Sequence, residues 1–277
     1  MSSDARPKRI TFVGAGNMAS AIIGGLINDG VNPSSITAAD PSAQAREMLA
    51  GLGVTDLHEN PRDAVGNADV VVLAVKPQIM AEVLRGLRGA FTPGTTVISI
   101  AAGISIAMLE DWIDSSDVHV VRCMPNTPAL VRCGASGLYA NKSVGERERH
   151  YADVTMACVG TTLWVDSEAK LDAVTAVSGS GPAYFFAFME AMIQSGERLG
   201  LSHDEAAELT LQTALGAARL ASEQNIPIAT LRRNVTSPGG TTEQALHAFQ
   251  AEKLDHVVGK AMDACHQRAE QMAKEFK

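Results

Sequence analysis

The chain has 277 residues and a formal net charge of -8, and 46% of its residues are hydrophobic while only 4% are aromatic. A chain of this length and apolar content can bury a sizeable aliphatic core and suits two modest domains better than one. The acidic balance disfavours nucleic acid as a partner, because an acidic surface repels phosphate backbones. The four cysteines form no CxxC pair, so we expect no metal site, and their sparse use suits a reducing compartment.

Two further features bear on cellular location. The segment up to Arg9 is polar and basic and contains no apolar run, so we expect no signal peptide. No stretch of about 18 apolar residues is free of charges and helix breakers, so we expect no membrane-spanning segment. Together with the sparse cysteines, these features predict a cytoplasmic protein.

The first half of the chain alternates short β-branched runs with helical stretches. We expect strands at residues 10–13, 36–39, 69–75, 95–100, 118–124, 136–139 and 162–165, and helices at 19–27, 43–52, 79–87, 104–113 and 146–159. Strands that alternate with helices are typical of βαβ units, in which a parallel sheet carries helices on both faces. The pattern therefore predicts an α/β domain with a doubly wound parallel sheet over residues 1–166.

The pattern changes after Asp166, and we expect only helices over residues 167–277. They are expected at 168–177, 183–199, 203–223, 242–250 and 254–274, with a capping box from Ser202 to Glu205. The helix that begins near Pro182 is apolar nearly all round, so it needs cover on several sides. A partner subunit is the favoured source of that cover, and neighbouring helices of the same chain are the alternative.

A glycine-rich turn joins the first strand, which ends at Val13, to the first helix. The segment Gly14-Ala15-Gly16-Asn17-Met18-Ala19 fits G-x-G-x-x-G/A, the turn that binds the pyrophosphate of dinucleotides. Gly14 permits the tight turn, Gly16 lets the backbone approach the pyrophosphate, and the helix N-terminus favours its negative charge. This predicts a Rossmann-like cofactor site, and a tight turn without a ligand is the alternative.

Polar or small residues follow three other expected strands. Asp40 ends the second strand, where a carboxylate can accept from both ribose hydroxyls of NADH and would repel the 2′-phosphate of NADPH; the alternative is that it opens a turn. Lys76, in Val75-Lys76-Pro77, either lines the cofactor cleft or is simply solvated. Ala101-Ala102-Gly103 either lets a nicotinamide ring approach or forms an ordinary turn.

Two loops of small residues enter helix N-termini in the second half. They are Ser178-Gly179-Ser180-Gly181-Pro182 and Ser237-Pro238-Gly239-Gly240-Thr241-Thr242. Helix N-termini bind carboxylates and phosphates, which predicts ligand sites. Plain helix capping is the alternative, and Thr241 with Gln244 matches a capping box.

These segments together closely resemble the pyrroline-5-carboxylate reductases from Ile10 to about Cys265. The resemblance is carried by the turn at Gly14, by Ala74-Val75-Lys76-Pro77-Gln78, Ala101-Ala102-Gly103, Arg122-Cys123-Met124-Pro125-Asn126-Thr127-Pro128 and Ser178-Gly179-Ser180-Gly181-Pro182, and most specifically by residues 234–242. It implies a Rossmann-like domain, a helical domain that dimerises, and assembly of dimers into larger oligomers. The activity implied is reduction of 1-pyrroline-5-carboxylate to L-proline with NADPH or NADH.

The resemblance also implies a role for individual residues. The cofactor contacts it implies are the segment Val13 to Met18, Asn60, the segment Ala74 to Pro77, and Ala101 and Ala102; the ribose contact at Asp40 rests on its position after the second strand. The substrate contacts it implies are Glu223, Ser237, Gly240, Thr241 and Thr242. The Thr242 hydroxyl is the candidate partner or proton donor for the ring nitrogen.

Two other classes of protein share part of this pattern. The β-hydroxyacid dehydrogenases join a Rossmann domain to a helical one, but they need a catalytic lysine on a helix of the second half. Lys170 is the only lysine between Asp166 and Lys253, and it precedes the glycine-rich loop. A non-catalytic NAD-sensing module would have no use for the loop at residues 237–242.

Overall fold

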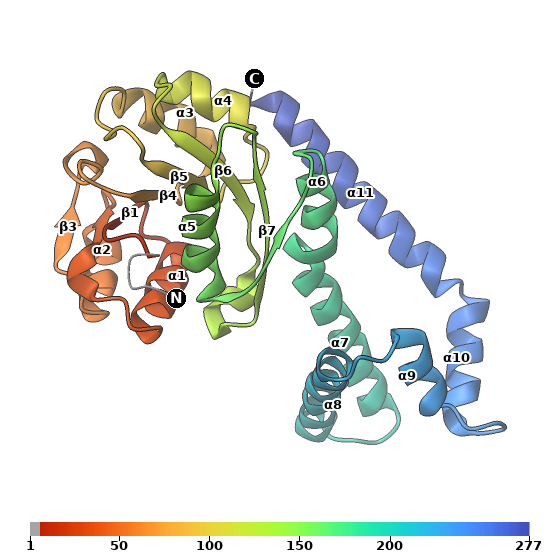
Figure 1. Ribbon diagram of the computed structural model, residues 1–277. Helices are drawn as coiled ribbons and strands as arrows, with labels where there is room; N and C mark the ends of the chain where they lie inside the picture. The colour runs from red at the N-terminus through yellow and green to blue at the C-terminus, as the bar shows by residue number, and fades with distance from the viewer. Residues whose placement is uncertain (1–5, 277) are drawn as a thin grey trace. The chain divides into compact units, whose positions relative to one another are not determined.

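The computed structural model describes residues 6–276, which divide into two compact units (Figure 1). The first unit contains the described residues up to Ser180 and those from Cys265 onward, and the second contains Gly181–Ala264. The last expected strand ends just before Asp166, but the compact units divide elsewhere. The division into functional domains at 1–166 and 167–277 therefore stays a prediction.

The first unit is built on one eight-stranded sheet of order β3-β2-β1-β4-β5-β6-β7-β8. The strands are β1 (Ile10–Val13), β2 (Ile36–Ala39), β3 (Asp56–His58), β4 (Val70–Leu73), β5 (Thr96–Ser99), β6 (His119–Met124), β7 (Gly134–Ala140) and β8 (Gly160–Trp164). All neighbours pair in parallel except β6 and β7. The seven expected strands are confirmed. Strand β3 was missed because its three residues, one exposed and two half-buried, carry no readable period.

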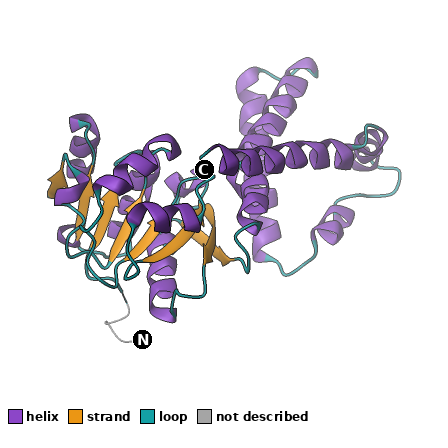
Figure 2. Cartoon of the chain, turned by 90° about the horizontal axis from the view of Figure 1, so that it is seen from above, coloured by secondary structure: helices purple, strands orange, loops and turns teal. Residues whose placement is uncertain are grey.

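Helices cover both faces of this sheet, as Figure 2 shows from above. They are α1 (Asn17–Asn28), α2 (Ala43–Gly51), α3 (Pro77–Gly86), α4 (Ile106–Ile113), α5 (Glu146–Ala157) and α6 (Lys170–Val174). On one face, Val70 and Val72 of β4 belong to the core that α1 and α5 complete. On the other, Val71 and Leu73 belong to the core completed by α3 and α4. This two-sided burial explains the apolar runs in the central strands and confirms the doubly wound fold.

The second unit is entirely helical. It contains α7 (Gly181–Arg198), α8 (His203–Glu223), α9 (Ile228–Asn234), α10 (Thr241–Ala251) and the first half of α11 (Leu254–Glu275). The capping box of α8 is confirmed: the Ser202 hydroxyl accepts from Glu205 N–H, and the Glu205 carboxylate accepts from Ser202 N–H. The short helix α9 was not expected.

One expected helix differs from the prediction. Residues 168–177 were expected as a plain helix, but α6 ends at Val174 and continues as a π-helical turn, η5 (Thr175–Gly179). Three 3₁₀ turns complete the first unit, η2 (Pro33–Ser35), η3 (Pro61–Asp63) and η4 (Thr127–Val131).

Among residues 6–276, none of the helices is both long and apolar enough to cross a bilayer. The expected absence of a signal peptide concerns Met1 to Arg9, and its first five residues lie outside the described part of the chain.

Candidate functional site

The turn after β1 needs glycine at its first position. Gly14 has a φ of +101°, which L side chains rarely adopt, and a Cβ there would lie 2.7 Å from the Ala74 carbonyl oxygen. Gly14 N–H donates to the Ala39 carbonyl at 2.8 Å, and Ala74 N–H donates to the Val13 carbonyl at 2.8 Å. The turn is thus clamped between the carboxyl ends of β2 and β4.

Packing within the chain gives no reason for glycine at the third position of the turn. Gly16 is the N-cap of α1 with an ordinary φ of -73°, and a Cβ built there meets no described atom within 4 Å. No described side chain caps α1, so its first N–H groups face outward at the positive end of the helix. An open, uncapped helix start behind a glycine is what a dinucleotide pyrophosphate requires.

Asp40, just past the end of β2, uses its carboxylate to join two loops. Its Oδ2 accepts from Ala15 N–H at 2.8 Å, and its Oδ1 accepts from Ser42 N–H at 2.8 Å. Each oxygen keeps lone pairs beyond these bonds, so a ribose partner is still compatible with the geometry. The Asp40 side chain thus opens the Asp40-Pro41-Ser42 turn and also bonds to the turn at Gly14–Ala19, and its ribose contact stays a prediction.

A cation also lies at the end of β2. Arg46, in the first turns of α2, donates from Nη1 to the Asp40 carbonyl oxygen at 2.6 Å and is half-buried. The first turn of α2 places residue 46 above the N-cap Ser42, which brings the Arg46 guanidinium back to the Asp40 carbonyl. The linear sequence did not predict this contact.

Asn60 lies after β3, at the same edge of the sheet. Its Oδ1 accepts from Arg62 N–H at 3.0 Å and so caps η3. The residue is exposed. The structure thus gives Asn60 a local role and leaves its predicted cofactor contact as a prediction.

The remaining expected cofactor residues follow β4 and β5. Ala74, Val75 and Pro77 are half-buried and Lys76 is exposed, with Pro77 as the first residue of α3. Ala101 is buried and Ala102 half-buried. Because Leu73 pairs with Ser99 in the parallel register, the two segments leave the sheet side by side. The carboxyl edge of such a sheet is where ligands of open α/β folds bind.

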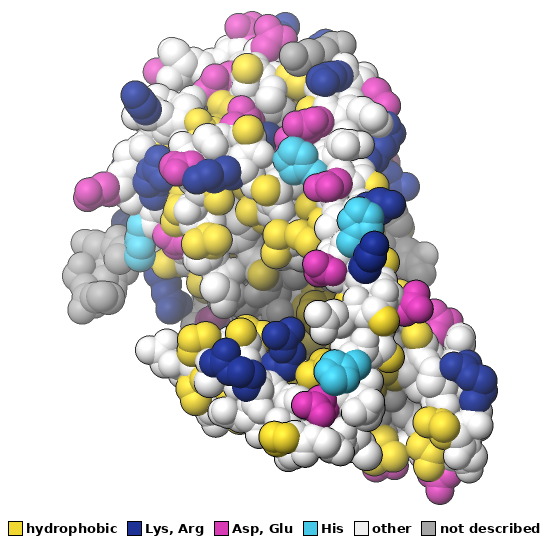
Figure 3. Space-filling view, turned by 90° about the vertical axis from the view of Figure 1, so that its right-hand side faces the viewer, with side chains coloured by type: hydrophobic (Ala, Val, Ile, Leu, Met, Phe, Trp, Pro, Cys, Tyr) yellow, Lys and Arg dark blue, Asp and Glu magenta, His cyan; other side chains and the backbone are white. Residues whose placement is uncertain are grey.

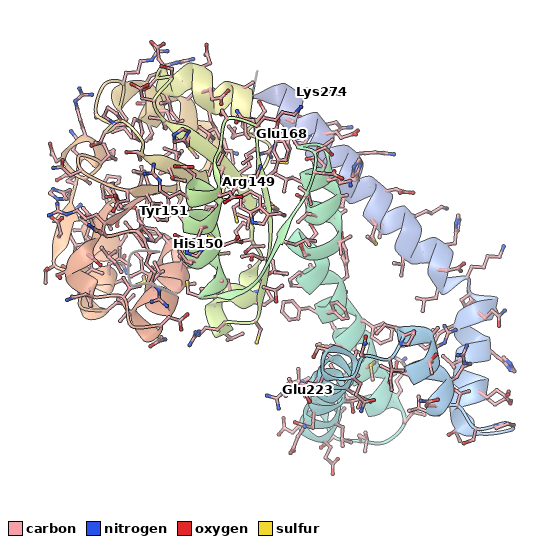
Figure 4. All side chains as sticks on the ribbon, viewed as in Figure 1. Arg149, His150, Tyr151, Glu168, Glu223 and Lys274 are labelled. Atoms are coloured by element: carbon pink, nitrogen blue, oxygen red, sulfur yellow. The ribbon has the colours of Figure 1, made fainter. Side chains whose placement is uncertain are left out.

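A partly buried ion pair that was not expected supports the segment after β5. Arg122 of β6 donates from Nη1 to Glu168 Oε1 at 2.8 Å, and the same oxygen accepts from Ile106 N–H at 2.7 Å. Arg122 is 9% exposed, so the pair is shielded from solvent on one side. Figure 4 labels Glu168 close to α6, the helix that begins two residues later. Glu168 therefore ties the Ala101–Ser105 loop to β6.

In the second unit, the loop at residues 237–242 is a tight turn leading into α10. Gly240 N–H donates to the Ser237 carbonyl at 3.0 Å, with Pro238 second and Gly239, at a φ of +70°, third, as a type II turn requires. A Cβ on Gly240 would lie 2.9 Å from the Ser237 carbonyl oxygen. Backbone geometry therefore accounts for both glycines.

The capping box expected from Thr241 to Gln244 is wrong. The N-cap is Gly240, so Thr241 and Thr242 are the first two residues of α10, and no described side chain caps this helix. The side chain that reaches back to the backbone before α10 is that of Glu243, and not that of Gln244. Its Oε2 accepts from Gly239 N–H at 2.8 Å. Both threonines are exposed, and the first N–H groups of α10 remain open to an anion.

Glu223, labelled in Figure 4, is the last residue of α8 and is exposed. Within the described chain, no hydrogen bond or ion pair joins Glu223 to the 237–242 turn. The five expected substrate residues lie in one unit, Glu223 at the end of α8 and the other four in the 237–242 loop. The fourteen expected cofactor residues lie in the other unit along one edge of its sheet.

Two further observations concern metal-ligating side chains and Lys170. The described residues contain no group of three or more His, Cys, Asp or Glu side chains that could hold a metal ion. Lys170, the lysine that the β-hydroxyacid dehydrogenase interpretation would need, pairs with Asp166 at 2.7 Å, and both side chains are more than half exposed.

Two family models match different parts of the chain. Residues 168–272 match the family described as pyrroline-5-carboxylate reductase dimerisation. Residues 9–103 match the family described as NADP oxidoreductase, coenzyme F420-dependent.

Relatives that match nearly the whole chain include several pyrroline-5-carboxylate reductases. The chain is 52% identical to a pyrroline-5-carboxylate reductase of Pseudomonas aeruginosa, over 97% of this chain and 98% of the relative, and 45% identical to that of Pasteurella multocida, over 97% and 99%. Among solved structures, the Coxiella burnetii reductase has a TM-score of 0.92 at 41% identity, covering 96% and 98% of the two chains. The Plasmodium falciparum reductase with NADP bound has a TM-score of 0.84 at 28% identity, covering 96% and 98%.

A dehydrogenase of the rival class is also similar in fold. The 3-hydroxyisobutyrate dehydrogenase of Mycobacterium tuberculosis has a TM-score of 0.52 at 20% identity and covers 70% of this chain. Likeness at that identity shows a shared fold and carries no inference about activity.

Proposed function

Since the chain belongs to the pyrroline-5-carboxylate reductase family, we propose that it reduces 1-pyrroline-5-carboxylate to L-proline, the last step of proline biosynthesis. The observation that carries the proposal is the 52% identity over nearly all of both chains, which includes every segment expected to contact cofactor or substrate. The reaction is a hydride transfer from NADPH or NADH to a C=N bond. The protein is thus an oxidoreductase that acts on a cyclic imine.

The residues of the first unit fit a nicotinamide dinucleotide. Gly16 and the uncapped start of α1 hold the pyrophosphate, with Val13 to Met18 as its turn. Asp40 and Asn60 hold the adenosine half, and Ala74 to Pro77 with Ala101 and Ala102 flank the nicotinamide half. When bound there, the nicotinamide supplies the hydride.

The end of β2 supports either form of the cofactor. The Asp40 carboxylate favours the free ribose hydroxyls of NADH, whereas the Arg46 guanidinium, at the Asp40 carbonyl, brings a positive charge that suits the 2′-phosphate of NADPH. The family matched by residues 9–103 is an NADP oxidoreductase, and the Plasmodium falciparum relative was solved with NADP bound. We therefore propose that the protein uses both cofactors, with preference set at Asp40.

The second unit holds the substrate in this proposal. The open N–H groups at the start of α10 bind the substrate carboxylate, with Ser237, Gly240 and Thr241 shaping the loop. The Thr242 hydroxyl is either a proton donor to the ring nitrogen or a hydrogen-bond partner that orients this nitrogen. Glu223 is the remaining substrate contact. The turn needs no side-chain cap, which frees both threonine hydroxyls for substrate.

The chemistry makes small demands on acid–base groups. A protonated imine accepts hydride readily, so the protein contributes mainly by holding the imine carbon against the nicotinamide and by excluding water. The backbone N–H groups and the Thr242 hydroxyl orient the ring, and no metal is required. This fits a site formed by small residues and helix ends.

The protein works as a homo-oligomer. The dimerisation family covers residues 168–272, which confirms the expected partner subunit in outline. Large hydrophobic side chains of the second unit are exposed, among them Phe185, Phe186, Leu209, Leu211, Ile228 and Val257. Figure 3 shows hydrophobic side chains reaching the surface of the face it presents. We propose a dimer through these helices, larger assemblies of dimers, no nucleic-acid partner, and a cytoplasmic location.

One assay tests the function directly. NADPH or NADH absorbance is followed with 1-pyrroline-5-carboxylate as acceptor, and proline is identified as the product. Oxidation of either cofactor that depends on the imine is the expected result. The β-hydroxyacid dehydrogenase alternative predicts instead NAD(P)⁺ reduction with a hydroxy acid and none with the imine.

A further inference from the structure

The π-helical turn η5 interrupts what would otherwise be one helix from α6 into α7. Ser180 N–H donates to the Thr175 carbonyl at 2.8 Å, five residues back, where an α-helix would use four. Such single π-turns are rare in helices and are often found at functional sites. This one therefore needs a local cause.

Pro182 supplies that cause. Proline has no N–H, and its ring clashes with the carbonyl of the residue four positions earlier, which is Ser178. The wider π-turn relieves that clash. The proline also leaves the Ser178 carbonyl without the helical N–H that it would normally accept from, and an unpaired carbonyl is costly even where it is only partly buried.

Asn126 provides the missing donor. Its Nδ2 donates to the Ser178 carbonyl oxygen at 3.0 Å, and its Oδ1 accepts from Ala135 N–H at 2.8 Å. The residue is 8% exposed. Because one partner is a carbonyl and the other an N–H, the orientation of the amide is determined, and neither aspartate nor leucine could make both bonds.

The segment held by Asn126 lies at the edge of the sheet assigned to the nicotinamide. Gly179 packs on Met124, the last residue of β6, so closely that a Cβ would lie 2.7 Å from Met124 Cε. Ser99 of β5 pairs with Arg122 of β6, so the residues two positions on, Ala101 and Met124, leave the sheet on neighbouring strands. Gly179 therefore packs at the carboxyl end of β6, the strand next to β5 from which the loop at Ala101 and Ala102 leaves.

We propose that Asn126 is a positioning residue for the reduction. It replaces the hydrogen bond that Pro182 cannot make, and so keeps the backbone of residues 178–180 against the carboxyl edge beside Ala101 and Ala102. That backbone flanks the edge of the sheet proposed for the nicotinamide half of the cofactor. The inference rests on the proposed function and adds a role for a residue outside the expected contacts.

Asn126→Asp is the most direct test. It keeps the size of the side chain and the acceptor for Ala135 N–H, but it turns an oxygen toward the Ser178 carbonyl. We expect kcat/KM for 1-pyrroline-5-carboxylate to fall about tenfold or more, since misplacement of about 1 Å is enough for such losses. The Kd for NADPH, measured by fluorescence, should change less than about threefold, because most cofactor contacts lie at β1 and β2.

A double-mutant cycle separates this role from general stability. Pro182→Ala restores an N–H at position 182, so the Ser178 carbonyl no longer depends on Asn126. In that background Asn126→Asp should cost less than about threefold in kcat/KM, and the difference between the backgrounds measures the coupling. Equal losses in both backgrounds would overturn the proposal, as would a single variant whose only defect is a lower Tm.

Hydrogen exchange gives a readout that does not need activity. In Asn126→Asp, the Ser180 amide should exchange faster, and Pro182→Ala should restore its protection; unchanged exchange in Asn126→Asp would contradict the proposal. Asn32→Asp is the matched control, since Asn32 caps η2 through its oxygen alone, which aspartate retains. If the wild-type protein reduces no imine, the proposed function fails, and exchange alone then decides whether Asn126 holds the turn.

Discussion

The Asp40 carboxylate accepts a hydrogen bond from Ala15 N–H, with 2.8 Å between Oδ2 and the nitrogen. The end of β2 and the cofactor turn after β1 are thereby joined through one side chain. A change at Asp40 must then alter two things together, the electrostatics at the proposed ribose site and the position of the turn. Predictions for this edge of the sheet have to separate the two.

Asp40→Ser should shift cofactor preference toward NADPH by about tenfold or more. A carboxylate beside a 2′-phosphate is a like-charge contact of about 1–3 kcal/mol, and about 1.4 kcal/mol is a factor of ten. The measurement is the ratio of kcat/KM for NADPH to that for NADH. The lost bond to Ala15 should weaken both cofactors alike, so an unchanged ratio with weaker binding of both would make Asp40 a loop residue only.

Gly16→Val should abolish most cofactor binding while leaving the fold intact. A Cβ at Gly16 meets no described atom, so valine is tolerated by the chain but occupies the space of the pyrophosphate. Binding is measured by NADPH fluorescence and folding by Tm. Gly14→Val is the contrasting variant, since its strained φ and the close Ala74 carbonyl predict loss of stability as well. Wild-type affinity in a folded Gly16→Val protein would remove the pyrophosphate from this turn.

Thr242→Val should lower kcat about 10- to 100-fold with little change in Tm. Valine keeps the branched shape and removes only the hydroxyl, which the structure does not use to cap α10. Thr241→Val is the control. With Gly240 as the N-cap, neither variant should cost the roughly 1 kcal/mol of a lost cap. A normal kcat in Thr242→Val would mean that the hydroxyl has no part in the reaction.

Sedimentation at micromolar concentration should give a dimer or a larger assembly. The exposed hydrophobic side chains of the second unit would otherwise remain in water, at a cost that a partner relieves. Phe185→Glu, in the apolar helix α7, should shift the equilibrium toward monomer. A wild-type species of 29.1 kDa would refute the prediction.

Thiol labelling of the native protein should reach Cys133 first and leave Cys123 and Cys158 unmodified at pH 8. Burial raises the pKa of the Cys123 thiol to about 12 and likewise raises the pKa of Cys158 to about 12. A raised pKa keeps the thiol protonated, so the reactive thiolate is only about 10⁻⁴ of either residue at that pH. Mass spectrometry identifies the labelled cysteine. Rapid labelling of Cys158 would show that the α1–α5 core opens.

The sequence alone determined the features that depend on local pattern. Seven strands, the change to an all-helical second half, the turn at Gly14 and the family resemblance were all read from residues close together in the chain. Apolar runs and glycine spacing predict these because strand burial and positive φ are properties of a few neighbouring residues.

Only the tertiary structure decided the contacts between segments that are distant in the chain. It showed that Asp40 bonds to Ala15, that Glu168 joins Arg122 to the start of α4, and that Asn126 reaches Ser178, 52 residues away. A proline before an apolar helix signals a break, but whether the break becomes a π-turn depends on a donor elsewhere that can satisfy the freed carbonyl. The cap of α10 was likewise decided by the turn at Ser237–Gly240, because the backbone placed Gly240, and not Thr241, at the helix start.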